Sequence, residues 1–193
     1  SGENSTTTGF FTTASGDNST AMGYQTTASG YFSTAMGYQT TASGSSATAM
    51  GDATTASGNS STAMGSGTTA SGYFATAIGY QTTASGFYSM AMGHGSRAET
   101  YGEVSLGFYP LANTGDVNSR VFTDVLLEVG NGVSGTPSNA LTIFKDGRMG
   151  LDNADTSALV THLLTLPNLN SATGGRGIAN AWNTYSDSRI KTG

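Results

Sequence analysis

The residues that could carry metal or acid–base chemistry are few and lie far apart in the sequence. The two histidines, His94 and His162, are isolated, and neither has the His-x-x-x-His or Glu-x-x-His spacing of metal ligands. We therefore expect His94 to be a solvated turn residue. We expect His162, which stands among leucines, to be a satisfied interface histidine; a ligand role is the alternative for each. The chain has no cysteine, which excludes disulfide bonds and thiolate metal sites.

Two short segments have the composition of binding loops but not their spacing. Segment 152–155 lacks the glycine and the distal glutamate of an EF-hand calcium loop, and segment 174–177 lacks the context of a phosphate loop. Glycoside hydrolysis needs a pair of carboxylates. The acidic residues of the repeat region are instead scattered among different repeats, as Glu3, Asp17, Asp52 and Glu99. The sequence therefore predicts no metal, no cofactor and no enzymatic activity for this chain.

The main feature of the chain is a strict repeat of 14 residues, whose clearest copy is STAMGYQTTASG at residues 33–44. A fixed period without insertions over about 100 residues indicates stacked, nearly identical coils. Each repeat is expected to hold two five-residue strands, punctuated by glycines such as Gly30, Gly37 and Gly44 that allow tight or positive-φ corners. A helical period never develops between these glycines. The sequence predicts a parallel β-roll.

The composition of the chain excludes several classes of function. Only 10% of the residues are charged, and the net charge is −5. Binding to a phosphate backbone needs a basic patch, which this composition does not provide, so we expect no nucleic-acid partner. No apolar run approaches the roughly 20 residues of a membrane-spanning helix, so we expect no membrane insertion. The strict period and the regular alanine and methionine positions argue against disorder despite the abundance of serine, threonine and glycine.

The strand of each repeat alternates between two uncharged faces. Thr34 and Met36 point to one side, and Ser33 and Ala35 to the other. A strand without a polar face is buried on both sides, so one face should line the roll and the other should contact a partner chain. We assign to the roll interior the column Met22, Met36, Met50, Met64, Ile78, Met92 and Leu106. The reverse assignment, with alanine inside, stays open and also predicts partner chains.

Variation between the repeats is concentrated in two turns, where aromatic residues recur. One turn carries Tyr24, Tyr38 and Tyr80, and the other carries Tyr31, Phe32, Tyr73, Phe74, Phe87 and Tyr88. Equivalent positions of stacked coils form ladders, so we expect these rows to shield the coil edges and stiffen the stack. The alternative is a surface that recognises a receptor or a glycan, because exposed aromatic residues mark recognition surfaces.

The repeat resembles the head repeat of YadA-type trimeric autotransporter adhesins. The resemblance rests on Thr-Ala-Met/Ile-Gly followed by an Ala-Ser-Gly strand, and it covers about residues 5–107. It implies a left-handed parallel β-roll, three chains around a common axis, and a role in surface attachment. The valine that is commoner in the family at the first strand position is threonine in most copies here.

After Pro110 the repeat ends and the composition becomes more apolar. Following the β-roll of residues 1–107, we expect a β-meander connector over 108–157, with strands at 120–129 and 139–144 and a tight turn at 145–148. Its apolar content is small for an isolated domain, and three copies that share one core would solve this. For residues 158–193 we expect an extended tail anchored by Trp182, with either a short helix at 158–164 or leucines that line a threefold axis.

The second half carries two further resemblances. Segments 128–132, 139–142 and 145–150 are similar to segments that link roll repeats to the C-terminus in bacteriophage tail-fibre-like proteins. Residues 186–191, SDSRIK, resemble the Ser-Asp-x-Arg-x-Lys entry to the intramolecular chaperone of endosialidase-type tail spikes. This resemblance implies chaperone-assisted trimerisation and self-cleavage between Ser186 and Asp187, with Ser186 as nucleophile and Lys191 as its partner, since a serine hydroxyl needs a nearby base. Without the chaperone body, we expect no cleavage in this chain.

Three classes of function are compatible with these observations. The first is a structural homotrimeric fibre, extracellular on a virion tail or a bacterial surface, that attaches to a host-cell receptor or glycan; the chaperone-like ending favours the virion. The second is a polysaccharide-degrading solenoid, which the scattered carboxylates disfavour. The third is an ice-binding solenoid, which by resemblance presents Thr-x-Thr on a flat face, whereas Thr26 and Thr27 are adjacent here and point to opposite faces. We favour the first.

Overall fold

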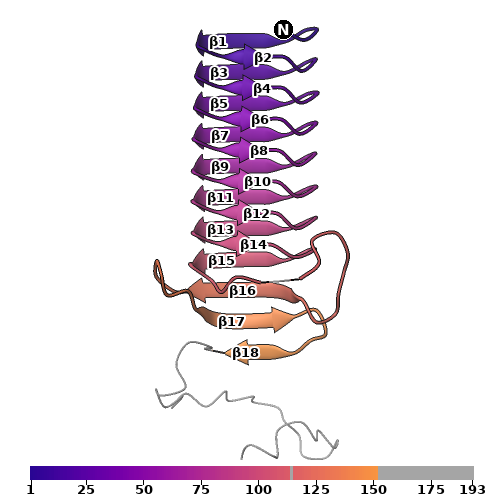
Figure 1. Ribbon diagram of the computed structural model, residues 1–193, viewed down its shortest axis with the longest axis vertical. Helices are drawn as coiled ribbons and strands as arrows, with labels where there is room; N and C mark the ends of the chain where they lie inside the picture. Colours follow the sequence, from indigo (N-terminus) through magenta and orange to yellow (C-terminus); the bar gives the residue numbers. More distant parts are fainter. Residues whose placement is uncertain (114, 152–193) are drawn as a thin grey trace, which may run out of the picture. The chain divides into compact units, whose positions relative to one another are not determined.

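The computed structural model describes residues 1–113 and 115–151. Within these residues the chain consists of strands, turns and loops, without a helix, and its first part is a stack of parallel coils (Figure 1). The predicted fold class, an all-β parallel solenoid, is confirmed. The expectations for the tail at 158–193, including the short helix, His162, Trp182 and the motif at 186–191, lie outside the described residues, as do segments 152–155 and 174–177.

Each coil contains one long and one short strand. The long strands are β1 (Thr6–Phe10), β3 (Thr20–Tyr24), β5 (Thr34–Tyr38), β7 (Thr48–Asp52), β9 (Thr62–Ser66), β11 (Thr76–Tyr80), β13 (Met90–His94) and β15 (Val104–Phe108). The short strands are β2 (Thr13–Ala14), β4 (Thr27–Ala28), β6 (Thr41–Ala42), β8 (Thr55–Ala56), β10 (Thr69–Ala70), β12 (Thr83–Ala84) and β14 (Arg97–Ala98). The prediction of two five-residue strands per repeat was wrong for the second strand. Its ladder ends because the N–H groups of Ser43 and Gly44 both donate to one oxygen, that of Ala56.

Equivalent residues of successive coils lie directly beside one another. Thr34 pairs with Thr48 and Met36 with Met50, and the same step of 14 residues holds between β1 and β15. The long strands form one parallel sheet and the short strands form another (Figure 1). Neighbouring strands in a sheet lie about 4.8 Å apart, so each column of equivalent side chains forms a ladder with that spacing.

Glycine is required both inside the long strand and at the tight corner before it. Gly37 has φ +124°, and a Cβ atom there would lie 2.0 Å from the carbonyl oxygen of Gly51. The corners with left-handed backbone are instead formed by other residues, for example Gln39 at φ +52° and Phe32 at φ +55°. The predicted tight corners are present at Gly30 and Gly44, where a Cβ atom would lie 1.9 and 2.0 Å from a carbonyl oxygen of the next coil, whereas the positive-φ corners are mostly formed by residues other than glycine.

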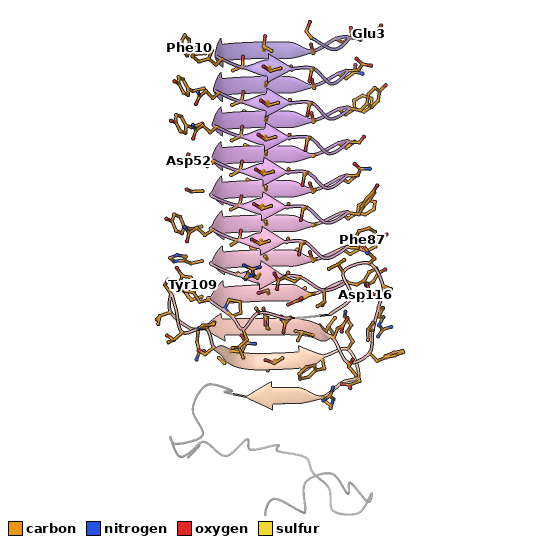
Figure 2. The ribbon with its side chains drawn as sticks, in the orientation of Figure 1. Glu3, Phe10, Asp52, Phe87, Tyr109 and Asp116 are labelled. Atoms are coloured by element: carbon orange, nitrogen blue, oxygen red, sulfur yellow. The ribbon has the colours of Figure 1, made fainter. Side chains whose placement is uncertain are left out.

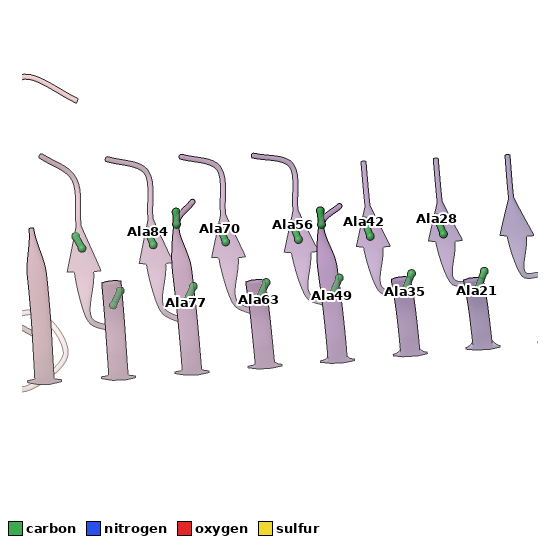
Figure 3. Packing of buried hydrophobic residues seen from close by; sticks show 14 of the residues in the cluster. Ala21, Ala28, Ala35, Ala42, Ala49, Ala56, Ala63, Ala70, Ala77 and Ala84 are labelled. Atoms are coloured by element: carbon green, nitrogen blue, oxygen red, sulfur yellow. The ribbon is translucent and has the colours of Figure 1, made fainter. Parts of the chain in front are cut away.

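Alanines line the interior of the roll (Figure 3), and buried serines and threonines fill the rest of it. Ala35 and Ala42, on opposite strands of one coil, are 0% exposed, as are Ser33 and Thr40. The methionines point outward, and Met22 and Met64 are each 37% exposed. Our assignment of the column Met22, Met36, Met50, Met64, Ile78, Met92 and Leu106 to the interior was therefore wrong. The reason is volume, because the two sheets of such a short coil face each other closely enough for alanine to fill the space between them.

The threonine column of the interior contains hydroxyl groups without hydrogen-bond partners. Thr26 is buried and Thr27 points outward, as their adjacency predicts. Among the described residues, no partner lies within hydrogen-bonding distance of the buried Oγ1 atoms of Thr26, Thr40, Thr54, Thr68 and Thr82. A buried hydroxyl without a partner costs free energy. The hydroxyl group thus does not explain why threonine stands at this position. The β-branched shape of the side chain, which valine shares, is the property that fits the interior.

The long sheet continues beyond the repeats. β16 (Val125–Asn131) pairs in parallel with β15 and keeps the column register, with Leu127 beside Val104 and Val129 beside Leu106. β17 (Asn139–Phe144) and β18 (Met149–Leu151) then add antiparallel to the same sheet. The strands expected at 139–144 and after the turn at 145–148 are present, whereas the strand expected at 120–129 begins later, at Val125.

Replacing a threonine of the interior by valine is predicted to stabilise the roll. In Thr54→Val the shape of the side chain is kept and a partnerless hydroxyl is removed, so the free energy of unfolding should rise by about 1 kcal/mol. Chemical denaturation of the two proteins measures the difference. Thr55→Val on the outer face is the matched control and should change stability by less than half as much. A lower stability of Thr54→Val would show that the hydroxyl is hydrogen-bonded in solution.

Candidate functional site

The outer side of the long sheet carries two uncharged columns, which we call the Met face. One column is Thr20, Thr34, Thr48, Thr62, Thr76 and Met90, and the other is Met22, Met36, Met50, Met64, Ile78 and Met92. Val104, Leu106, Leu127 and Val129 extend both columns onto β15 and β16. The side chains of the Met face are half-buried to exposed in the single chain. This strip is suited to packing against another apolar surface, because no side chain in it carries a charge.

The first aromatic ladder lies where the long strands end (Figure 2). Tyr24 and Tyr38 stack with ring centres 5.3 Å apart and planes 6° apart, and Phe10 stacks on Tyr24 at 5.6 Å. Asp52 and Ser66 interrupt the ladder in the next two coils, and Tyr80 resumes it with an edge contact to His94. The predicted aromatic ladders are therefore present, although they are not continuous.

His94 is more constrained than a solvated turn residue. It is half-buried, and its Nε2 atom shares a hydrogen bond of 2.9 Å with the hydroxyl oxygen of Tyr109. The expectation of a solvated side chain was therefore wrong, because the ring lies between Tyr80 and Tyr109. Among residues 1–113 and 115–151, no three potential metal-ligating side chains come together.

The second aromatic ladder lies on the opposite edge, in the loops that precede the long strands, which Glu3 and Phe87 mark in Figure 2. Phe74 and Tyr88 stack with centres 5.1 Å apart and planes 2° apart, and Tyr73 lies 4.9 Å from Phe87. Aromatic rings on this edge remain about half exposed in the single chain, for example Phe74 at 52%. The two interpretations of these rows, stiffening and recognition, are therefore compatible with each other.

The four carboxylates considered for glycosidase chemistry do not gather at one place. Asp17 accepts a hydrogen bond from the backbone N–H of Glu3 on the loop edge, and Asp52 lies on the other edge (Figure 2). Glu99 pairs with Arg97. Glu3 and Asp17 thus lie in neighbouring loops of one edge, whereas Asp52 lies on the opposite edge and Glu99 follows a short strand.

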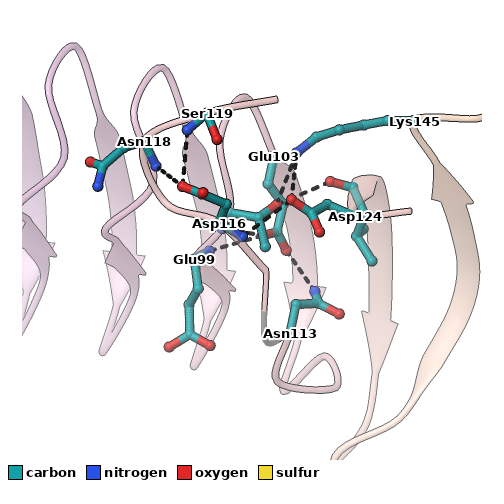
Figure 4. Close-up of polar contacts among 10 residues, drawn as sticks. Glu99, Glu103, Asn113, Asp116, Asn118, Ser119, Asp124 and Lys145 are labelled. Carbon is teal, nitrogen blue, oxygen red and sulfur yellow. Dashed lines mark hydrogen bonds and ion pairs between the residues drawn. The ribbon is translucent and has the colours of Figure 1, made fainter. Parts of the chain in front are cut away.

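A buried polar cluster closes the end of the roll, and sequence reasoning missed it (Figure 4). Glu103 is fully buried, and its Oε2 atom accepts hydrogen bonds from the backbone N–H groups of Glu99 and Thr100 at 2.9 and 2.8 Å. The Nδ2 atom of Asn113 donates to both Glu103 Oε1 (2.7 Å) and Glu128 Oε2 (2.9 Å). One amide group therefore joins two buried carboxylates.

Glu128 has two further hydrogen-bond donors. The Ser105 hydroxyl donates to its Oε1 atom at 2.7 Å, and Asn139 Nδ2 donates to its Oε2 atom at 3.0 Å. Glu103 stands 14 residues after Ser89, at an interior position of the repeat. That register is the signal that could have placed its side chain inside. Glu128 lies beside Ser105, which continues the alanine column, but only the structure brings them together.

Burial changes the acidity of both carboxyl groups. Loss of water raises the pKa of Glu103 despite its hydrogen bonds to backbone and Asn113. Burial also raises the pKa of Glu128 to about 7, against the hydrogen bonds from Ser105 and Asn113, and the nearby charge of Glu103 adds to the rise. A buried ion pair between Lys145 and Asp124, at 3.4 Å, lies beside this cluster. The cluster can hold or release a proton near neutral pH.

The fold and these surfaces define a structural β-solenoid with an uncharged lateral face. Comparison with protein-family models identifies the YadA head domain repeat in overlapping windows, at residues 1–26, 14–40, 28–54, 42–68, 56–82, 70–96 and 84–102. The matched windows span more than half of the chain, and the chain belongs to the family of the YadA head repeat. This confirms the resemblance of the repeats and indicates a surface-exposed, extracellular protein of the adhesin type. Comparison with curated proteins gives no match. No helix in the described part of the chain is long and apolar enough to cross a membrane.

Stability is predicted to fall as pH rises through neutrality. The pKa of Glu128 is about 7 in the folded state and 4.5 as its ordinary value, so the folded chain binds more protons between these values. Its contribution to stability is complete below pH 4.5 and is lost as pH rises to 7 and above. We expect the melting temperature to be roughly 5 °C lower at pH 8 than at pH 5.

Glu128→Gln should be more stable than the native chain at pH 8 and should lose most of this pH dependence. Thermal unfolding followed by circular dichroism measures both effects, with Glu99→Gln as the control outside the buried pair. An equal pH dependence in Glu128→Gln and the native chain would assign the effect to other groups.

Proposed function

We propose that this chain is a rigid segment of a homotrimeric fibre that attaches to a surface, with the Met faces of three chains packed around a common axis. The observation that carries the proposal is the Met face itself, because it repeats at every coil and bears no charge. Membership of the YadA head-repeat family supports a trimeric adhesin-type assembly. A partner of the same shape and repeat would match every column along the strip.

The energetics of the Met face favour such an assembly. Burying a methionine side chain completely stabilises by about 1.5–3 kcal/mol, and the half-exposed residues here would gain part of that amount. Six repeats of the column on each of three chains are sufficient to offset the cost of association, on the order of 10 kcal/mol. Methionine also adapts its shape to irregular gaps, and the alternating threonines let the faces approach closely.

The role we propose is mechanical attachment without catalysis. The stacked backbone ladders give rigidity, and the exposed aromatic rows give a surface for a host-cell receptor or glycan. We place the fibre on a virion tail or a bacterial surface. The tail-fibre-like segments between 128 and 150 and the motif at 186–191 favour the virion. We further propose that a longer precursor matures by chaperone-assisted trimerisation and cleavage between Ser186 and Asp187, with Ser186 and Lys191 in the roles given above.

The native chain should have a solution mass near three times 19.5 kDa. Size exclusion coupled to light scattering measures it, and the mass should persist on dilution. In Met50→Glu, three carboxylates would meet at the axis, so this variant should dissociate or lose at least 10 °C in melting temperature because buried unpaired charge is costly.

Ser57→Glu is the matched control, because Ser57 is exposed on the outer side of the short strands. It should keep the mass and the melting temperature of the native chain. A native mass of 19.5 kDa, or equal effects of the two substitutions, would contradict the proposed trimer.

A further inference from the structure

We call the edge formed by the loops that precede the long strands the loop edge. On it, two polar loops, at 45–46 and 59–60, lie between aromatic loops at 31–32 and 73–74, and we call these two polar loops the break. Backbone hydrogen bonds connect successive loops, from Ser46 N–H to Tyr31 O, from Ser60 N–H to Ser45 O, and from Phe74 N–H to Asn59 O. The residues at the second loop position are therefore stacked in the order Phe32, Ser46, Ser60 and Phe74. Three steps of about 4.8 Å separate the two phenylalanines, which gives about 14 Å.

The aromatic residues on both sides of the break occupy a backbone conformation that disfavours them. Phe32 has φ +55° and Phe74 has φ +57°, in the left-handed region, where bulky side chains are uncommon and strained. Ser46 and Ser60 adopt the same conformation at φ +55° and +54°, so the coil does not need an aromatic residue here. Because Phe32 and Phe74 are also 54% and 52% exposed, burial within the chain does not account for them.

The break offers one open aromatic face and several polar atoms. Tyr88 stacks on one face of Phe74, so the other face is turned toward the loop that carries Ser60. Asn59 lies in the same loop, where its Nδ2 atom donates to the Tyr73 hydroxyl at 3.2 Å and its Oδ1 atom accepts from Ser45 N–H at 3.1 Å. The amide is thus held in place while one of its N–H groups remains available for a ligand.

Charge limits the chemistry of the ligand. Residues 1–96 contain no lysine or arginine, whereas Glu3, Asp17 and Asp52 are acidic. A sulfated or carboxylated glycan would meet net repulsion along this part of the roll. A neutral sugar would not, and its apolar C–H face and its hydroxyl groups match an aromatic ring beside serine and asparagine side chains.

We propose that this break binds a neutral oligosaccharide. One sugar ring stacks on the open face of Phe74, and its hydroxyl groups bond Ser60 and Asn59, while Phe32 limits the site at the other end. This inference rests on the proposed attachment function and names the class of ligand that one surface of the fibre would take. In a trimer three equivalent sites would act together, which raises the apparent affinity for a surface that displays many sugars.

The test uses the native chain with three tetrasaccharides: cellotetraose, chitotetraose and a heparin-derived tetrasaccharide. Binding is followed by saturation-transfer NMR and titrated to the millimolar range. At least one neutral tetrasaccharide should bind, and the heparin fragment should not. Phe74→Ser should weaken the binding about tenfold, since one aromatic contact is lost. Ser60→Phe should abolish it, because a ring then covers the open face.

The chain itself supplies matched controls. Serine is already tolerated at the equivalent position in Ser60, and phenylalanine in Phe74, so both variants should fold. Phe11→Ser removes an exposed aromatic residue with the same backbone conformation, φ +55°, outside the loop edge, and it should bind as the native chain does.

The inference would be overturned by no binding of either neutral sugar, or by unchanged binding in both variants. It would also be overturned if Phe74→Ser dissociated the assembly, because the ring would then belong to a contact between chains. These outcomes are separate from the proposed function. A trimer that attaches to surfaces without binding either sugar contradicts only the inference, whereas a monomer contradicts the fibre.

Discussion

The close approach of the two sheets inside each coil is the constraint on which the rest of the structure depends. The short strand contributes one alanine to the interior, the long strand contributes another, and threonine or serine fills the remaining space. Larger side chains have no place there, so methionine must point outward. The stacking of successive coils sets a second constraint: it requires glycine at positions such as Gly37, where the backbone has φ +124° and a Cβ atom would meet the next coil. A core of alanines buries little apolar area per residue. Stability therefore has to come largely from the backbone ladders and from contacts on the Met face.

A stack of identical coils also needs a capping structure, because the last coil would otherwise expose its interior and its unpaired edge strands to water. At the C-terminal end the interior columns change from alanine and serine to Glu103, Ser105 and Glu128, and Asn113 closes the space between the two carboxylates. Three strands, two of them antiparallel to their neighbours, then replace the coils. The polar cluster thus joins the repeats to the connector. Because its hydrogen bonds suit one arrangement, it fixes the register of β16 against β15 at the cost of a pH-sensitive carboxyl group.

The sequence predicted the architecture because its 14-residue period can be read directly, and residues 14 apart pair with each other in successive coils. Alternation showed which residues share a face, such as Thr34 with Met36, but it did not show which face lies inside. That choice depends on the width of the coil, which no local pattern encodes. The buried pair was harder to find, because Glu128 reaches Glu103 only through a loop of irregular structure. The partner of His94 was missed for the same reason, since Tyr109 lies in the next coil after a corner whose geometry the repeat does not specify.

The proposed packing of the methionine column against two other chains has a direct chemical signature. Methionine sulfur in an exposed column reacts with dilute hydrogen peroxide, whereas sulfur packed at an interface is protected. Mass spectrometry of the native chain should show slow oxidation of Met36, Met50 and Met64, and fast oxidation after dissociation in mild denaturant. The reference is a methionine-containing peptide mixed into the same reaction, which should be oxidised quickly in both states, because Met149 pairs with Ile143 on the continuation of the Met face. Oxidation of Met36, Met50 and Met64 in the native chain as fast as in that peptide would contradict the packing of the Met face against partner chains.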